Sequence, residues 1–210
     1  MKIAIFGGSF DPPHTGHLEL ARAALRSARA ERVLFIPAAR PPHKPGRVLA
    51  PFAHRLAMVR LLIQGEPAMD TDDIEETWGQ GRQSYTVETI RELIRRRPGD
   101  SFRLLIGADM ALTFDTWKEA DTLLRLAPPL VAARPGFAFP AGFGTELPAG
   151  LSPEGRAILA RGIFTAAVSD CASTAIREGF RTSAETPGLI PAVAAYIREN
   201  GLYAPQGETR

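Results

Sequence analysis

The residues with the clearest chemical potential lie in one loop near the start of the chain, where Gly7 and Gly8 are followed by His14 and His17. The loop follows a short apolar run and precedes a stretch with helical spacing, which is where backbone N–H groups can bind an anion. The glycines let a ligand approach the backbone closely. Two imidazoles at the positive end of a helix could donate to phosphate oxygens and stabilise charge that develops in a transition state. We therefore expect a phosphate site here.

Other interpretations of this loop are weaker. It has neither the closing Gly-Lys-Ser/Thr of a Walker A loop nor a Gly-x-Gly-x-x-Gly pattern. The two histidines could bind a metal ion, but only Asp11 lies nearby as a third ligand, and they could also be incidental surface residues. We expect no metal site built from side chains.

A second group of polar residues follows the last apolar run of the chain. Ser173 and Thr174 would begin a helix there, and Arg177 lies one turn further on. Hydroxyl-bearing residues at a helix start are ordinarily caps. Together with a guanidinium they could also hold a phosphate. Lys44, in the proline-rich stretch 41–44, is one of three lysines and could add a point charge to the same anion.

The elements that must position these residues alternate along the chain, which is typical of a parallel α/β sheet. We expect strands at 2–6, 32–36, 68–71, 102–106, 130–133 and 163–168. We expect helices at 17–29, 52–64, 86–97, 116–126, 152–161, 173–180 and 191–200. A further short helix should begin at Gly107, and Thr86 should cap the helix at 86–97. Doubly wound sheets bind ligands where strand carboxyl ends meet helix starts.

Composition limits the class of protein. The 210 residues are 45% hydrophobic and 23% charged, which is typical of a globular chain. A net charge of +2 does not suggest a protein that coats nucleic acid. The lone Cys171 excludes a disulfide within the chain and a cysteine-based zinc site. No apolar run is long enough to span a bilayer. We expect a cytoplasmic protein with one domain at 1–203, a C-terminal helical part at about 169–203, and a disordered tail at 204–210.

Residues 7–17 and the run Ser173-Thr-x-Ile-Arg177 together resemble the paired signatures of the nucleotidyltransferase superfamily that carries the HxGH motif. The chain is most similar to the bacterial nicotinate-nucleotide adenylyltransferases, since 41–44, 55–58, 84–86, 107–109 and 134–136 also match. The resemblance covers nearly the whole chain. It departs from the family at Cys171-Ala172, where the family usually has Ile-Ser, so one hydroxyl beside the phosphate site is lost.

The resemblance implies a Rossmann-like nucleotidyltransferase fold, a doubly wound parallel sheet with a C-terminal helical cap. The family transfers AMP from ATP to the 5′-phosphate of nicotinate mononucleotide and releases pyrophosphate. Mg²⁺ would be held mainly by the substrate phosphates and water. The implied partners are these two small molecules, with no nucleic acid and no membrane. The resemblance leaves open whether the protein forms a homo-oligomer.

The resemblance also implies roles for individual residues. Catalytic roles at the ATP phosphates would belong to His14, His17, Lys44 and Arg177. ATP binding would involve Gly7, Gly8, Ser9, Phe10, Gly107, Asp109, Ser173 and Thr174. The mononucleotide would be bound by Tyr85, Thr86, Trp117 and Arg134.

Several of these roles have structural alternatives. Trp117 could be a core aromatic, Tyr85 could be structural, and Asp109 could simply complement a helix dipole. A sister transferase that uses phosphopantetheine or nicotinamide mononucleotide is the nearest rival function. A nucleotide-binding regulatory module without catalysis is a rival from another class.

Overall fold

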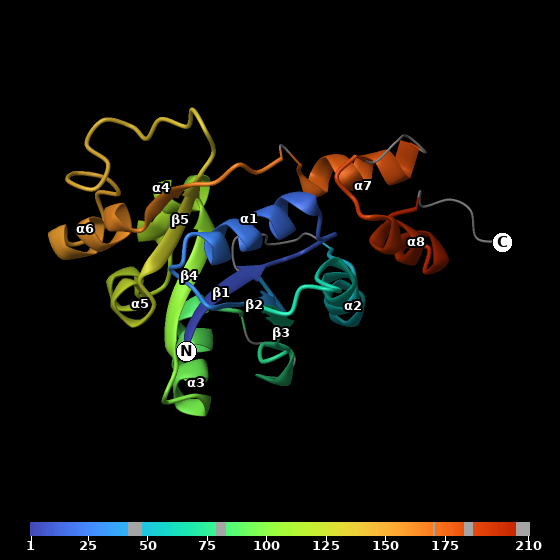
Figure 1. Ribbon diagram of the computed structural model, residues 1–210, viewed down its shortest axis with the longest axis horizontal. Coiled ribbons are helices and arrows are strands. Elements are labelled where there is room, and N and C mark those ends of the chain that lie inside the picture. Colours follow the sequence, from blue (N-terminus) through green and yellow to red (C-terminus); the bar gives the residue numbers. More distant parts are fainter. Residues whose placement is uncertain (42–47, 79–82, 170, 183–186, 205–210) are drawn as a thin grey trace.

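A computed structural model describes residues 1–41, 48–78, 83–169, 171–182 and 187–204 of the chain. At its centre is a six-stranded sheet in which every strand pair is parallel, in the order β3-β2-β1-β4-β5-β6 (Figure 1). The doubly wound parallel sheet expected from the sequence is confirmed. The strands are β1 (Lys2–Gly8), β2 (Arg32–Pro37), β3 (Met69–Thr71), β4 (Ser101–Gly107), β5 (Pro129–Ala133) and β6 (Ile163–Thr165).

The order of the strands creates a switch point between β1 and β4. From β1 the chain moves outward through β2 to β3, and it then returns to the other side of β1 with β4. Connections therefore leave the carboxyl ends of β1 and β4 in opposite directions, which opens a crevice where ligands bind in sheets of this kind.

Helices cover both faces of the sheet. They are α1 (Thr15–Arg26), α2 (Phe52–Leu62), α3 (Thr86–Arg96), α4 (Ala108–Leu112), α5 (Ala120–Leu126), α6 (Pro153–Arg161), α7 (Ser173–Thr182) and α8 (Pro191–Glu199). The described residues also form two single 3-10 turns, η1 (Glu76–Trp78) and η2 (Phe114–Thr116). No described helix is both long enough and apolar enough to cross a membrane.

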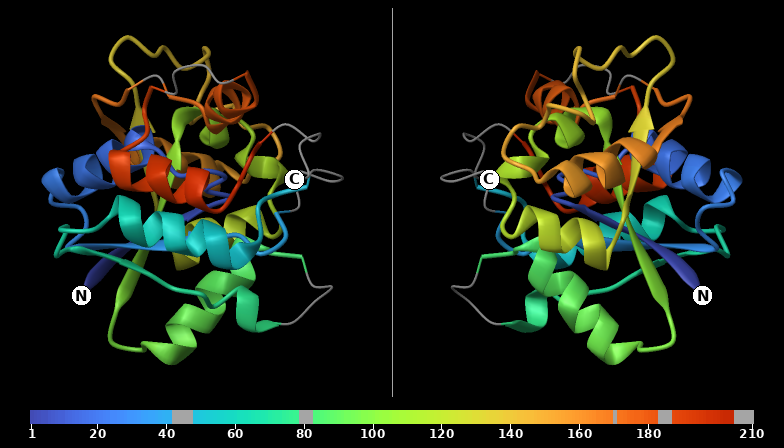
Figure 2. Two further views of the ribbon diagram at one scale, coloured as in Figure 1. Left: turned by 90° about the vertical axis from the view of Figure 1, so that its right-hand side faces the viewer. Right: turned by 90° about the vertical axis from the view of Figure 1, so that its left-hand side faces the viewer.

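The apolar core is split by the sheet into two halves, as the alternation of side chains along β1 requires. Ile3 and Ile5 pack under α3, α5 and α6, whereas Ala4 and Phe6 pack under α1, α2 and α8. The left view of Figure 2 shows α8 beside α2, and the right view shows α6 beside α5. The last described helix is thus part of the core rather than an appendage.

Among the element boundaries that differ from the sequence expectation, three have a clear structural cause. β1 continues through both glycines expected in the loop, because Gly7 and Gly8 pair with the end of β2. The strand expected at 163–168 ends at Thr165, since β6 is an edge strand and its only neighbour, β5, ends at Ala133. The helix expected at 116–126 begins only at Ala120, because Glu119 has a left-handed backbone (φ 51°) that separates η2 from α5.

Candidate active site

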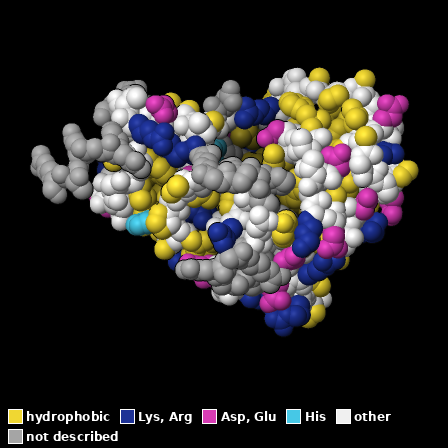
Figure 3. Space-filling view, turned by 180° about the vertical axis from the view of Figure 1, so that it is seen from behind, with side chains coloured by type: hydrophobic (Ala, Val, Ile, Leu, Met, Phe, Trp, Pro, Cys, Tyr) yellow, Lys and Arg dark blue, Asp and Glu magenta, His cyan; other side chains and the backbone are white. Residues whose placement is uncertain are grey.

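Two cavities open at the switch point. The first, of about 510 Å³, is lined by His14, His17, Gly107, Asp109, Arg134 and Phe137 among others, and is called the histidine cavity below. The second, of about 630 Å³, is called the tryptophan cavity, and its lining includes Gly7, Gly8, Ser9, Tyr85, Thr86 and Trp117. Both reach the carboxyl ends of β1 and β4, as the switch-point rule predicts. In Figure 3, Lys and Arg side chains lie at the rim of a hollow in one face of the molecule.

The two histidines form one unit at the start of α1. His14 is the cap residue of this helix, with extended backbone, so α1 begins two residues before the predicted position. The backbone N–H of His14 donates to Nδ1 of His17 across 3.1 Å, and the ring centroids lie 3.7 Å apart. Because Nδ1 of His17 accepts, a neutral His17 carries its proton on Nε2. His17 is therefore oriented as a hydrogen-bond donor.

His14 is the more buried member of the pair, with 7% of its surface exposed. Burial lowers the pKa of His14 to about 4, although the nearby Glu19 opposes the shift. Its Nδ1 is buried and has no hydrogen-bond partner among the described residues. Gly16 leaves room for the ring, since a Cβ there would lie 3.1 Å from that Nδ1. His14 is a neutral imidazole at physiological pH.

Phe10 shapes the carboxyl end of β1, where Gly7 and Gly8 lie. Phe10 has a left-handed backbone (φ 45°), and its ring is buried beneath Gly8. A Cβ at Gly8 would lie 3.0 Å from Phe10 Cζ. The ring also packs edge-on against His17, with centroids 5.1 Å apart. Only the backbone of Phe10 could meet a ligand, because its side chain belongs to the core.

The end of β4 brings an acid to the histidine cavity. Gly107 caps α4, and Asp109 stands in the first turn of this short helix. A Cβ on Gly107 would lie 2.5 Å from Asp109 Oδ1, so the glycine is what admits this carboxylate. Arg134, which follows β5, lines the same cavity. The predicted ATP-binding residues Gly107 and Asp109 thus share a cavity with both histidines.

The tryptophan cavity has an aromatic wall. Trp117 stacks on Phe114, with ring centroids 4.9 Å apart and planes inclined by 15°. Phe114 is fully buried, so it fixes the indole from behind. Lys118 Nζ lies 4.3 Å from the centroid of the Tyr85 ring, in cation–π contact. A flat ligand could lie against the Trp117 ring.

The start of α3 forms another part of this wall. Tyr85, and not Thr86, is the cap residue, so the predicted cap at Thr86 is wrong. Thr86 already has helical backbone, and no side chain caps the helix start. The first N–H groups of a helix lack partners within the helix, and they attract negative charge. An anionic group in the tryptophan cavity would find them at Thr86 and Val87.

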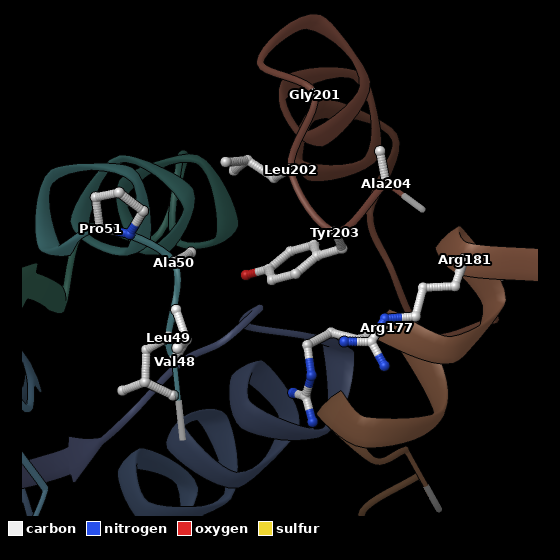
Figure 4. Close-up of a pocket in the computed structure, with 10 residues that line it drawn as sticks. All are labelled: Val48, Leu49, Ala50, Pro51, Arg177, Arg181, Gly201, Leu202, Tyr203 and Ala204. Atoms are coloured by element: carbon white, nitrogen blue, oxygen red, sulfur yellow. The ribbon is translucent and has the colours of Figure 1, made fainter. Parts of the chain in front are cut away.

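The second motif docks on the first. Ser173 Oγ donates to the Pro12 carbonyl across 2.9 Å, and Arg177 Nη2 donates to Thr174 Oγ1 at the same distance. Arg177 lines neither cavity at the switch point. It lies on a third cavity of about 870 Å³, called the C-terminal cavity, together with Arg181, Tyr203 and Ala50 (Figure 4). The predicted catalytic residue Lys44 lies outside the described residues.

Sequence reasoning did not identify two buried charged residues that support these walls. Arg55 donates through Nη1 to the Ser9 carbonyl (2.8 Å) and through Nε to the Ala50 carbonyl (2.9 Å). Glu75 accepts from the Ala39 N–H (3.2 Å) and the Thr89 hydroxyl (2.8 Å). Burial lowers the pKa of Arg55 and raises that of Glu75. The only sequence signal was that 55–58 matched the family.

His54, by contrast, has a plain structural contact. Its Nδ1 lies 2.9 Å from the Tyr196 hydroxyl and joins α2 to α8. Among the described residues, no group of three or more His, Cys, Asp or Glu side chains is arranged to hold a metal ion.

Comparison with known proteins identifies the family. The model of the cytidylyltransferase-like family matches residues 5–179. The chain is 37% identical to the nicotinate-nucleotide adenylyltransferase of Bacillus subtilis, over 96% of this chain and 98% of that protein. The chain belongs to the nicotinate-nucleotide adenylyltransferase family. A probable nicotinate-nucleotide adenylyltransferase of Solibacter usitatus is 36% identical over 97% of this chain and all of that one.

Solved structures agree on the fold of this adenylyltransferase family member. Nicotinic acid mononucleotide adenylyltransferase of Plasmodium falciparum, complexed with NaAD, superposes with a TM-score of 0.74 at 16% identity, over 96% of this chain and 97% of that one. A putative nicotinate-nucleotide adenylyltransferase of Vibrio parahaemolyticus gives a TM-score of 0.66 at 18% identity, over 96% and 94%. At these identities the likeness concerns the fold.

Proposed function

We propose that this protein transfers the AMP group of ATP to the 5′-phosphate of nicotinate mononucleotide, which yields nicotinate adenine dinucleotide and pyrophosphate in NAD biosynthesis. The observation that carries the proposal is the pair of cavities at one switch point. One is lined by the two histidines and the other by an aromatic wall with an uncapped helix start. Two substrates bound there would meet at the loop that follows β1. The names of the full-length relatives support the same reaction.

ATP would occupy the histidine cavity. Asp109 and Gly107 would contact the adenosine, with Arg134 at the edge of the same cavity. The phosphates would lie against the backbone of Gly8 and Ser9 and against the His17 Nε2–H donor. Ser173, Thr174, Arg177 and Lys44 would complete the phosphate site from α7 and from the stretch 41–44. Mg²⁺ would arrive with ATP, held by phosphate oxygens and water.

Nicotinate mononucleotide would occupy the tryptophan cavity. The pyridine ring would stack on the indole of Trp117, which Phe114 supports from the other side. The carboxylate would lie at the start of α3, near Tyr85 and Thr86, where the helix N–H groups and dipole favour an anion. An uncharged carboxamide would gain much less there. This difference is what favours the nicotinate form as acceptor.

The chemistry needs little beyond alignment and charge stabilisation. A phosphate oxygen of the mononucleotide attacks the α-phosphorus of ATP, a new P–O bond forms, and the bond to the β-phosphate oxygen breaks to release pyrophosphate. The nucleophile is already ionised at neutral pH, so no general base is required. His17 would donate through Nε2–H to oxygens that gain charge in the transition state. The backbone N–H of His14, which donates to Nδ1 of His17, would hold His17 in that orientation.

Pyrophosphate release from Mg-ATP, measured in parallel with three acceptors, tests the proposal. The acceptors are nicotinate mononucleotide, nicotinamide mononucleotide and phosphopantetheine. We expect strong turnover with the nicotinate form alone. Turnover with either of the others would keep the reaction type and refute the assigned acceptor. If ATP binds but no acceptor gives pyrophosphate release, the proposed enzymatic activity is refuted, and a nucleotide-binding regulatory module is favoured. We place the reaction in the cytoplasm, consistent with a chain that has a single cysteine.

A further inference from the structure

Asp11 joins four separate parts of the chain. It lies in the loop between β1 and α1 and is 1% exposed. Its Oδ1 accepts hydrogen bonds from the Tyr203 hydroxyl (2.7 Å) and from the Ala50 N–H (3.1 Å). Its backbone carbonyl accepts from Nη1 of Arg177, and the same Nη1 lies 3.8 Å from Asp11 Oδ2. One buried carboxylate is thus shared by the C-terminal segment, the segment before α2, and α7.

Arg177 is held by this arrangement. One end of its guanidinium contacts Asp11, and the other donates to Thr174 Oγ1. The side chain is only 11% exposed. Figure 4 shows the guanidinium of Arg177 and the ring of Tyr203 reaching into the C-terminal cavity from opposite elements. A guanidinium fork binds strongly where it meets a carboxylate or a phosphate, so Asp11 competes with any phosphate for this group.

The C-terminal turn is shaped to deliver the Tyr203 hydroxyl. Beyond α8, Leu202 N–H donates back to the Ile197 carbonyl across 3.0 Å, and Gly201 has a left-handed backbone (φ 60°). Tyr203 also has a positive φ of 63°, which is uncommon for a residue with a side chain. The surroundings must hold it there. This turn brings the Tyr203 hydroxyl to Asp11, 192 residues earlier in the chain.

We propose that Tyr203 is a positioning residue for nucleotide transfer, which acts through Asp11 on Arg177. Its hydroxyl donates a hydrogen bond to the Asp11 carboxylate and thereby disperses part of the negative charge that faces Arg177. Asp11 therefore orients Arg177 but leaves its guanidinium able to turn to the phosphates of ATP. Without the hydroxyl, the buried carboxylate has one donor fewer and binds the guanidinium more strongly. Arg177 is then less available to ATP. The inference rests on the proposed function, in which Arg177 binds phosphate.

Tyr203→Phe tests this with a matched control on the same part of the chain. Tyr196→Phe removes another partly buried tyrosine hydroxyl, on α8, and the partner of that hydroxyl is His54 and not Asp11. We expect kcat/KM for ATP to fall by about fivefold or more in Tyr203→Phe, the size of a coupling between groups in one network. The KM for nicotinate mononucleotide should stay unchanged. Tyr196→Phe should cost similar stability and leave both parameters unchanged. Equal kinetics in the two variants would overturn the proposal.

A double-mutant cycle with Arg177→Lys separates positioning from general loosening. If Tyr203 acts through Arg177, then Tyr203→Phe should change kcat/KM for ATP by less than about twofold once lysine replaces the fork. An undiminished effect in that background would overturn the proposal, since Tyr203 would then act by another route.

Binding of Mg-ATP in the absence of acceptor, measured by calorimetry, makes the test independent of the acceptor. We expect Tyr203→Phe to weaken binding and Tyr196→Phe to leave it unchanged. If the wild-type protein releases no pyrophosphate with nicotinate mononucleotide, the proposed function fails, and this binding result still decides the role of Tyr203. Equal affinities in the wild type and Tyr203→Phe would refute that role.

Discussion

The backbone N–H of His14 and the ring Nδ1 of His17 are joined by a hydrogen bond of 3.1 Å. This contact caps the start of α1 and also decides which nitrogen of His17 carries the proton in its neutral form. The same residue therefore stabilises a helix and aims an N–H donor. The two tasks use different nitrogens, so substitutions can separate them.

His17→Ala should lower kcat by about 10²–10³, the usual cost of one preorganised transition-state donor. His17→Asn should lower kcat as much but keep more of the stability. The amide oxygen of Asn can accept from His14 N–H as Nδ1 does, whereas no atom takes the place of Nε2. Steady-state kinetics and urea unfolding of both variants check this. Near-normal turnover in His17→Ala would remove the donor role.

Acid should destabilise the fold through His14. Because burial lowers the pKa of His14 to about 4, the unfolded chain takes up this proton at higher pH than the folded one. The free energy of unfolding should thus decrease as pH falls from 6.5 towards 4 and level off below. The difference from the ordinary value of 6.5 corresponds to a contribution of about 3 kcal/mol.

Urea unfolding at a series of pH values, on the wild type and on His14→Gln, measures that contribution. Carboxylates titrate in both proteins, so the difference between the two curves reports His14 alone. We expect the stability of the variant to fall less steeply between pH 6.5 and pH 4. Parallel curves would show that His14 titrates normally in the folded state.

Trp117→Ala should raise the KM for nicotinate mononucleotide by about tenfold or more, the usual loss when an aromatic stacking surface is removed. The KM for ATP should change little, because ATP is assigned to the other cavity. Trp117→Phe is the matched control, since a smaller ring could still stack on Phe114 and should recover part of the affinity. Equal changes in both KM values in Trp117→Ala would refute the stacking role.

Gly107→Ala should weaken ATP binding while leaving the fold intact. The added Cβ would lie 2.5 Å from Asp109 Oδ1, and this carboxylate can rotate away without backbone movement. We expect a KM for ATP raised several-fold, as in Asp109→Ala, at nearly unchanged thermal stability. Gly99→Ala is the control, since nothing lies within 4 Å of its Cβ. An unchanged KM for ATP in Gly107→Ala would argue against the adenosine contact of Asp109.

The layered α/β fold followed from local patterns in the sequence. Apolar runs of strand length alternate with helical periodicity, and that alternation by itself favours a parallel sheet with helices on both faces. The approximate bounds of β1, β2 and β4 and the loop with His14 and His17 were predictable for the same reason. Errors arose where the neighbours decide, as in β6, which ends where its partner β5 ends.

The chemical character of the site was also predictable from residue types, because glycines and histidines in one loop and an arginine in the first turns of a helix together favour an anion site. The sequence alone therefore determined the fold class and the family that the chain resembles, and it predicts phosphate binding in the loop after β1 and at the start of α7. It could not assign those loops to cavities. Arg177 was expected beside the histidines, yet it lines a separate cavity and contacts Asp11 in the loop that precedes them.

Only the tertiary structure decided the contacts between distant segments. The Tyr203–Asp11 bond spans 192 residues, the Ser173–Pro12 bond spans 161, and the Arg55–Ser9 bond crosses from a helix to a loop. No local periodicity encodes such pairs, because they depend on the order of the strands and on how α7 and α8 pack. The proton position on His17 and the depressed pKa of His14 likewise follow from burial and hydrogen bonding in the folded chain.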